Sequence, residues 1–337
     1  KVDGERFMGG PESPGAYPGP ACYRNGGPLT VTDANLFLGR LEANKFPKIF
    51  GPNRDQALDE SVVHEKFEEL AKKAGMPAAE VAEGFLEVAA NTMARAIKKV
   101  SVERGQDPKD FALASFGGAA GQMACKVAEA VGMKKIFVHP FSSVLSAFGI
   151  GHADEKFKKK MRVESLLKEY QTFEEDFKKL REKCLTGLPN ADEFQSVFYL
   201  RALGSDYELA VPADSAQRAK EKFEKEYQVL FGLPFSGEVE IASLSVEATL
   251  NSGFEGEVVD QEGEAVLDGP SVLSSNKTCI VVEKGWSAKK NQFGEWSLIR
   301  EESEKGGGQK NKKVQLEIFY QRFQSIAEQM GHTLQSL

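Results

Sequence analysis

The stretch FALASFGGAAGQMACKVAEAVGMKKIFVHPFSSVLSAFGIG, residues 111–151, decides how this chain folds. It opens with an apolar run, residues 111–116, that ends at two glycines and so predicts a buried strand followed by a sharp turn. An amphipathic segment follows, and Gly132 stands where a glycine ends a helix. Residues 136–138 are typical of a second buried strand. Strand, turn, helix and strand over roughly thirty residues predict a βαβ unit with parallel strands.

Gly117, Gly118 and Gly121 lie between the first strand of this unit and the start of its helix. Backbone N–H groups in the first turn of a helix lack helical partners, so an anion or nucleotide can approach them where no Cβ intervenes. The same glycines also suit tight packing of the strand against the helix, and both interpretations stay open. GGAAGQ matches neither the dinucleotide pattern GxGxxG nor the P-loop pattern GxxxxGK[ST].

Composition limits the class of protein. The 337 residues are 41% hydrophobic, which suits about two globular domains, and the net charge of −7 argues against a partner such as duplex nucleic acid. The four cysteines and four histidines are dispersed, so no disulfide framework and no zinc site is predicted. The sequence has neither an apolar run of membrane-spanning length nor a signal-peptide pattern, and we expect a cytoplasmic protein that does not contact a membrane.

Before the central stretch, a tract rich in glycine and proline predicts tight, specific loops rather than a linker. Asp33 precedes a helical pattern over residues 34–41, where it suits the N-cap position, although it can also face a ligand. The longest helix is predicted over residues 77–105, because one apolar stripe runs through it from Pro77 to Gly105.

After the central stretch, charge increases. The basic run 156–160 opens a helical pattern that continues to residue 180, and we interpret the run as a solvated helix face. Alternating residues predict a hairpin of segments 194–200 and 207–211. The remaining predictions, in chain order, are a helix over 213–231, a strand over 238–250, a strand over 278–282, a flexible polar linker over 289–313 and an amphipathic helix from 314 to the end.

Several stretches together resemble the ATP-dependent 5-oxoprolinase and hydantoinase A family. GPESPGAYPGPACYRNGGPLTVTDANLFLGRL, residues 10–41, is similar to the family's most distinctive tract, and FGPNRDQALD, residues 50–59, follows in the expected order. Residues 116–154 correspond to the family's glycine-rich βαβ segment, with Ala120 in place of a usual glycine and Met123 in place of a usual histidine. The final VQLEIFYQRFQSIAEQMGHTLQ resembles the opening of the hydantoinase B region, as in fused single-chain 5-oxoprolinases.

The resemblance implies an α/β fold, namely the C-terminal part of an actin, Hsp70 and sugar-kinase-like (ribonuclease H-like) ATPase domain, followed by a smaller α+β region. The domains expected on this basis are a partial ATPase-like domain over residues 1–155, an α+β region over 156–285, a flexible linker over 286–313 and the truncated start of a hydantoinase B-like region over 314–337. The family's first phosphate loop and its aspartate are not found before Lys1, nor most of the B region after Leu337. The resemblance therefore predicts a fragment that is inactive alone.

The implied function is ATP-dependent hydrolysis of 5-oxo-L-proline to L-glutamate, a reaction of glutathione metabolism. Hydantoin hydrolysis, ketone carboxylation and a non-catalytic remnant are the alternatives. ATP and Mg²⁺ are the implied cofactors, and the expected partners are a lactam substrate, the remaining A and B regions and further copies in a homo-oligomer. The predicted nucleotide-binding residues are Gly117, Gly118, Ala119, Gly121 and Gln122. Asp33 and Asn35 are predicted to contact substrate, and no catalytic residue or metal ligand is assigned.

Overall fold

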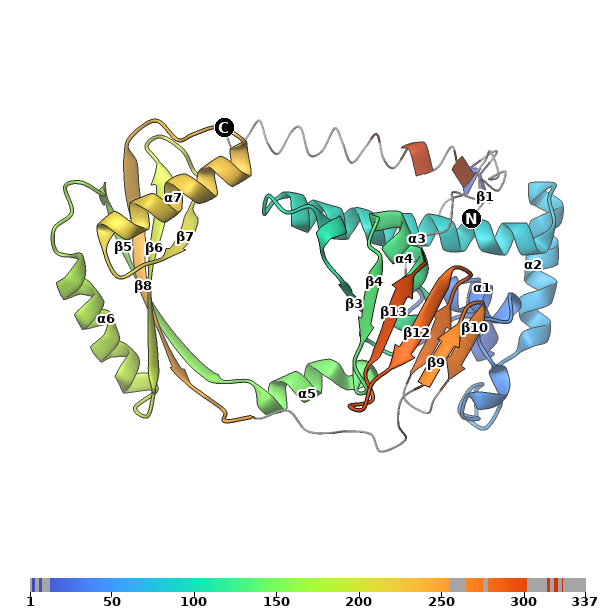
Figure 1. Cartoon of the computed structure of the whole chain (residues 1–337). Coiled ribbons are helices and arrows are strands. Elements are labelled where there is room, and N and C mark those ends of the chain that lie inside the picture. The colour runs from blue at the N-terminus through green and yellow to red at the C-terminus, as the bar shows by residue number, and fades with distance from the viewer. Residues whose placement is uncertain are drawn as a thin grey trace. The chain divides into compact units, whose positions relative to one another are not determined.

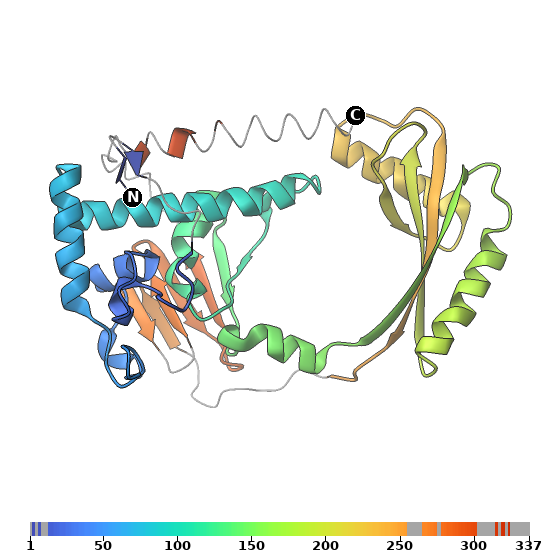
Figure 2. The ribbon, with the colours of Figure 1, turned by 180° about the vertical axis from the view of Figure 1, so that it is seen from behind.

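The computed structural model describes residues 2–3, 6–7, 13–254, 265–274, 278–301, 314–315, 318–320 and 323. The chain divides into two compact units, which Figures 1 and 2 show from opposite sides. Unit 1 holds the described residues of 1–102, 106–145 and 257–327, and unit 2 holds those of 103–105 and 146–256. No helix in these described parts is long and apolar enough to cross a membrane.

A five-stranded mixed sheet organises unit 1. Its order is β3 (Leu113–Ala114), β4 (Lys135–Val138), β13 (Trp296–Arg300), β12 (Trp286–Lys290) and β9 (Ala265–Asp268). β3 and β4 are parallel, and the other neighbours are antiparallel. A separate hairpin joins β10 (Ser271–Ser274) to β11 (Cys279–Val282), and short strands β1 (Val2–Asp3) and β2 (Arg6–Phe7) pair near the start of the chain.

Helices complete the core of unit 1. They are α1 (Val31–Phe37), α2 (Glu60–Ala74), α3 (Ala78–Val102) and α4 (Ala124–Val131). Figure 1 shows α3 and α4 beside the sheet, and α4 contacts both β4 and β11. The core includes Phe67 of α2, Leu86 of α3, Ile136 of β4 and Trp286 of β12, all fully buried. α5 (Leu145–His152) begins at the last residue of this part of unit 1, and its other residues belong to unit 2.

Besides most of α5, unit 2 consists of an antiparallel sheet with two helices. Its elements in chain order are β5 (Glu155–Leu166), α6 (Phe173–Gly187), β6 (Glu193–Ala202), β7 (Leu209–Pro212), α7 (Ala216–Phe231) and β8 (Val239–Leu250). The strand order is β5, β8, β6, β7. Phe177 of α6 and Phe223 of α7 share one core with Phe198 and Leu244 of the sheet.

The predicted βαβ unit is confirmed. Leu113 lies opposite Ile136 in a parallel pair, α4 connects the two strands, and Gly132 ends α4 with φ of +100°. The predicted length of the first strand is wrong, because β3 comprises two residues and both Phe111 and Phe116 are about half exposed. The hairpin of β6 and β7 and the long helix α3 also confirm their predictions.

Four other predictions are wrong. The basic run 156–160 lies on strand β5, not on a helix, because β8 pairs with this strand along almost its whole length. Residues 286–300, expected in a linker, form β12 and β13, and β9 to β11 join unit 1 although the sequence grouped them with residues 156–285. Asp33 is not an N-cap, since α1 begins one turn earlier with Thr30 as its cap. Residues 302–313 and most of the predicted C-terminal helix lie outside the described residues.

Candidate functional site

The glycine turn, residues 117–122, leaves the sheet of unit 1 at the carboxyl end of β3. Gly117 has φ of +98°, a conformation that glycine adopts without strain. Its N–H donates to the carbonyl oxygen of Ser142 (2.7 Å), a residue that follows β4. The segments that follow β3 and β4 therefore contact each other at this edge of the sheet. Ligands of open α/β sheets bind at the carboxyl ends of parallel strands.

Two residues of the glycine turn are open to a ligand. Gly118 and Ala119 are exposed, and their N–H groups have no hydrogen-bond partner among the described residues. A Cβ built on Gly118 meets no heavy atom within 4 Å. Consecutive free N–H groups form a concavity that suits an anion or a polar nucleotide edge.

Of the other three predicted nucleotide-binding residues, Gly117 is half-buried, whereas Gly121 and Gln122 are buried and already in contact with protein. A Cβ on Gly121 would stand 2.5 Å from the carbonyl oxygen of Cys279, so this glycine permits β11 to pack against the turn. Gln122 accepts at two atoms, from the Asn35 side chain at Oε1 (3.2 Å) and from Arg40 at its main-chain oxygen (2.9 Å). The structure therefore separates an open part, Gly118 and Ala119, from a packed part, Gly121 and Gln122.

A buried polar network fastens the packed part of the turn to α1 and β11. Arg40 donates from Nε to Asn35 Oδ1 (2.7 Å) and from Nη1 to Glu283 Oε1 (2.6 Å). Lys126 lies 3.8 Å from the same Glu283 oxygen and 2.9 Å from Glu83 of α3. Asn35 and Arg40 are 0% and 8% exposed, so their polar atoms depend on one another for hydrogen bonds.

Asp33 holds the loop before α1. Its carboxylate accepts from the N–H groups of Ala21 (3.1 Å), Cys22 (2.8 Å) and Thr30 (2.8 Å), and from the Thr30 hydroxyl (2.9 Å). Burial, and secondly the negative charge of Asp33, raise the pKa of the Cys22 thiol. The geometry gives Asp33 a structural task and brings Asn35, not Asp33, to the glycine turn.

Sequence reasoning missed Arg40 and Glu283. Arg40 had only the local signal of standing just after a short helix, and Glu283 is 243 positions further along the chain. Within the described part of the chain, no group of three or more His, Cys, Asp or Glu side chains could hold a metal ion.

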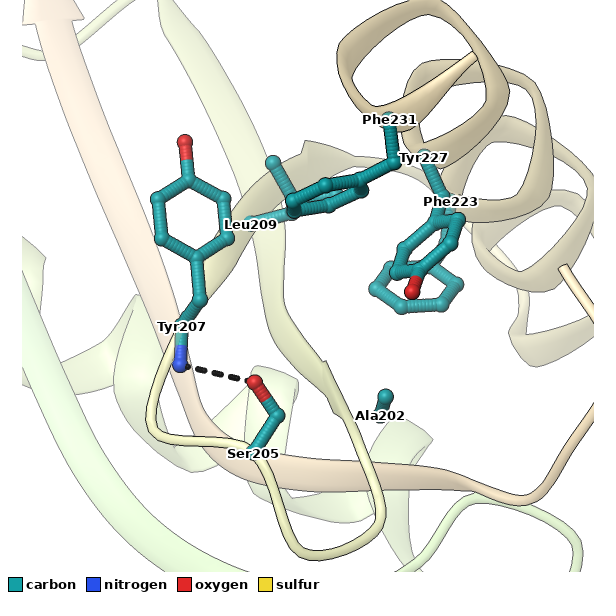
Figure 3. A pocket seen from close by; sticks show the side chains of 7 residues that line it. All are labelled: Ala202, Ser205, Tyr207, Leu209, Phe223, Tyr227 and Phe231. Carbon is teal, nitrogen blue, oxygen red and sulfur yellow. Dashed lines mark hydrogen bonds between the residues drawn. The ribbon is translucent and has the colours of Figure 1, made fainter. Parts of the chain in front are cut away.

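Unit 2 has a small aromatic hollow, which Figure 3 shows between the loop after β6 and α7. Tyr207, Leu209, Phe223, Tyr227 and Phe231 line it, and the space left between them does not admit a water molecule. The hollow is therefore a packing feature of unit 2 and not a ligand site.

Comparisons with known proteins identify the class. The sequence profile of the hydantoinase/oxoprolinase family matches residues 1–159. The 5-oxoprolinase PfmaA of Pestalotiopsis fici is 33% identical over 393 aligned residues, which cover 97% of this chain and 30% of that protein. The chain thus spans about 30% of the length of this curated relative.

Solved structures resemble the fold. The crystal structure of the ATP-dependent caprolactamase from Pseudomonas jessenii matches with a TM-score of 0.74 and 25% identity, over 89% of this chain and 51% of that chain. Nucleotide-free acetone carboxylase, from work on ATP-dependent acetone carboxylation, matches with a TM-score of 0.58 and 17% identity, over 86% and 49% of the two chains. The protein belongs to the 5-oxoprolinase and hydantoinase A family, a class that includes ATP-dependent hydrolases of cyclic amides.

Proposed function

We propose that this chain forms one side of the nucleotide site of a 5-oxoprolinase-like enzyme. The observation that carries the proposal is the pair of exposed, unbonded N–H groups of Gly118 and Ala119 at the carboxyl end of a parallel strand. The family and the ATP-dependent caprolactamase support ATP as the nucleotide. Gly117 shapes the turn, whereas Gly121 and Gln122 hold it in place.

In this proposal, unit 1 is the C-terminal part of an actin and Hsp70-like ATPase domain. The β-α-β arrangement of β3, α4 and β4 supports it, because such domains hold nucleotide beside a glycine turn. Mg²⁺ would be held by the phosphate oxygens together with water and few protein groups, as is usual for this ion. Unit 2, the lactam substrate and the remaining A and B regions complete the proposed enzyme, which we place in the cytoplasm as a homo-oligomer.

The chemistry follows from the poor reactivity of an amide carbonyl. The oxygen of the 5-oxo-L-proline carbonyl receives the γ-phosphoryl group of ATP, the bond from that phosphorus to ADP breaks, and the carbonyl carbon becomes a strong electrophile. Water adds to this carbon, the ring C–N bond breaks, and the nitrogen takes up a proton, which leaves an acyl phosphate on the opened chain. A second water molecule hydrolyses this acyl phosphate and releases L-glutamate and phosphate. Phosphoryl transfer depends mainly on positioning and on charge stabilisation, which backbone N–H groups can supply.

The test is substrate-dependent ATP hydrolysis by the full-length protein. ADP and glutamate should form in equal amounts when 5-oxo-L-proline is added with ATP and Mg²⁺. No turnover with 5-oxo-L-proline, beside turnover with caprolactam or hydantoin, would move the assignment to another cyclic amide. Caprolactam is the specific second candidate, because the caprolactamase structure matches 89% of this chain. Failure to bind ATP at all would refute the nucleotide site.

A further inference from the structure

Gln122, the last residue of the glycine turn, is held at two separate atoms by neighbours from a distant part of the chain. Its main-chain oxygen precedes α4 and accepts from Arg40 Nη2 (2.9 Å). Its side-chain oxygen accepts from Asn35 Nδ2 (3.2 Å). Buried backbone oxygens need a donor, and Arg40 supplies the donor here.

Arg40 also fixes the residue that holds the other atom. Its Nε donates to Asn35 Oδ1 (2.7 Å), which sets the amide so that Asn35 Nδ2 points at Gln122. The backbone N–H of Arg40 donates to the carbonyl oxygen of Asn35 (2.8 Å), which closes the arrangement. Three residues thus form a ring of hydrogen bonds with Arg40 as the donor at three points.

Charge balance explains why an arginine occupies this position. Glu283 lies 2.6 Å from Arg40 Nη1, so the buried guanidinium has a counter-charge from the segment after β11. β11 itself packs against the turn, since the carbonyl oxygen of Cys279 leaves no room for a Cβ at Gly121. The planar guanidinium offers donors in three directions at once, and the single ammonium group of lysine cannot reproduce that geometry.

We infer that Arg40 is a positioning residue for the nucleotide site: by holding Gln122, Asn35 and Glu283 it fixes the glycine turn, so that the N–H groups of Gly118 and Ala119 keep one orientation. The inference rests on the proposed function for its consequence, which is ATP binding. Arg40 itself is buried, and its side chain bonds to protein groups at Asn35, Gln122 and Glu283. It acts only through Gln122 and the turn.

Arg24 offers a matched control in the same unit. Its Nε donates to the carbonyl oxygen of Ala57 (2.7 Å) and its Nη1 pairs with Asp59 (2.6 Å), so it also joins a carbonyl and a carboxylate. None of its bonds reaches the glycine turn. Arg24→Lys and Arg40→Lys therefore remove the same kind of contact at different places.

The experiment compares Arg40→Lys with Arg24→Lys in the full-length protein. Hydrogen exchange of peptides covering residues 117–123 is measured beside the Kd for ATP, under conditions where melting curves show both variants folded. Arg40→Lys should accelerate exchange in these peptides at least about tenfold and weaken ATP binding at least about tenfold, as expected for loss of a charged hydrogen bond worth one or more factors of ten. Arg24→Lys should change neither value beyond about twofold.

Each other outcome has a defined meaning. Unchanged exchange at residues 117–123 in Arg40→Lys overturns the inference, and so does faster exchange with unaltered ATP affinity. Equal effects of both variants on ATP affinity also overturn it, since they would indicate general destabilisation. If the wild-type protein does not bind ATP, the proposed function fails, whereas the exchange data still decide whether Arg40 holds the turn.

Discussion

Two glycines of the turn, the buried Gly121 and the exposed Gly118, should respond to substitution in opposite ways. In Gly121→Ala the new methyl group would stand 2.5 Å from the Cys279 carbonyl oxygen and 3.1 Å from Ile280 Cγ1. Backbone must move to relieve this contact, and overpacking of this kind costs about 1–3 kcal/mol. The melting temperature should fall by about 2–4 °C for each kcal/mol in a unit of this size.

Gly118→Val is the partner variant, because a Cβ at this position meets nothing within 4 Å and the backbone is not left-handed. Its effect on the free energy of unfolding should stay within about 0.5 kcal/mol. The branched side chain would cover the free N–H groups, so the KM for ATP of the full-length protein should rise at least about tenfold, a change of about 1.4 kcal/mol.

Steady-state kinetics and melting curves on the same preparations separate these effects. Gly121→Ala should act mainly on the melting temperature, and its KM should rise less than that of Gly118→Val. A Gly118→Val protein with unaltered KM and a melting temperature lowered as in Gly121→Ala would refute the reasoning, and the glycine turn would then serve packing alone.

Three further outcomes are expected. Asp33→Ala should lower the free energy of unfolding by about 3 kcal/mol or more in urea titrations, because two buried N–H groups and one half-buried N–H group lose their acceptor at about 1–3 kcal/mol each. Normal stability with lost turnover would instead indicate a substrate contact. Burial raises the pKa of the Cys125 thiol to about 12, so above pH 9 the unfolded chain releases a proton that the folded chain keeps. The free energy of unfolding should therefore fall by up to about 1.4 kcal/mol per pH unit. An unchanged free energy of unfolding between pH 9 and 11 would contradict this. The hydrogen bond from the Tyr170 hydroxyl (2.6 Å) is the main cause that lowers the pKa of Asp176 below 3.8. Unit 2 should therefore lose stability as the pH falls below that value. Tyr170→Phe should reduce this acid dependence, which urea midpoints measured from pH 5 to 2 can check.

The sequence alone determined those elements whose signals are local. The βαβ unit follows from two apolar runs around a glycine turn and a helix ended by Gly132, and α3 follows from a long apolar stripe after Pro77. The hairpin of β6 and β7 was predictable for the same reason, since alternation and a turn lie within a few residues of each other. The prediction of Gly118 as a ligand contact also came from its place after a strand, whereas the prediction of Ala119 came from the family resemblance.

Only the tertiary structure decided the elements whose partners are distant. The basic run 156–160 has the polarity of a solvated helix face, yet β8 supplies backbone partners along the whole run, which therefore forms a strand. β13 pairs with β4 although more than 150 residues separate them, so a segment that reads as a polar linker becomes part of a sheet. The division of the glycine turn into open and packed parts, and the role of Arg40, depend on β11 and Glu283. Hydrogen bonds and steric contacts between such remote residues leave no periodic signal in the sequence, because they depend on three-dimensional proximity alone.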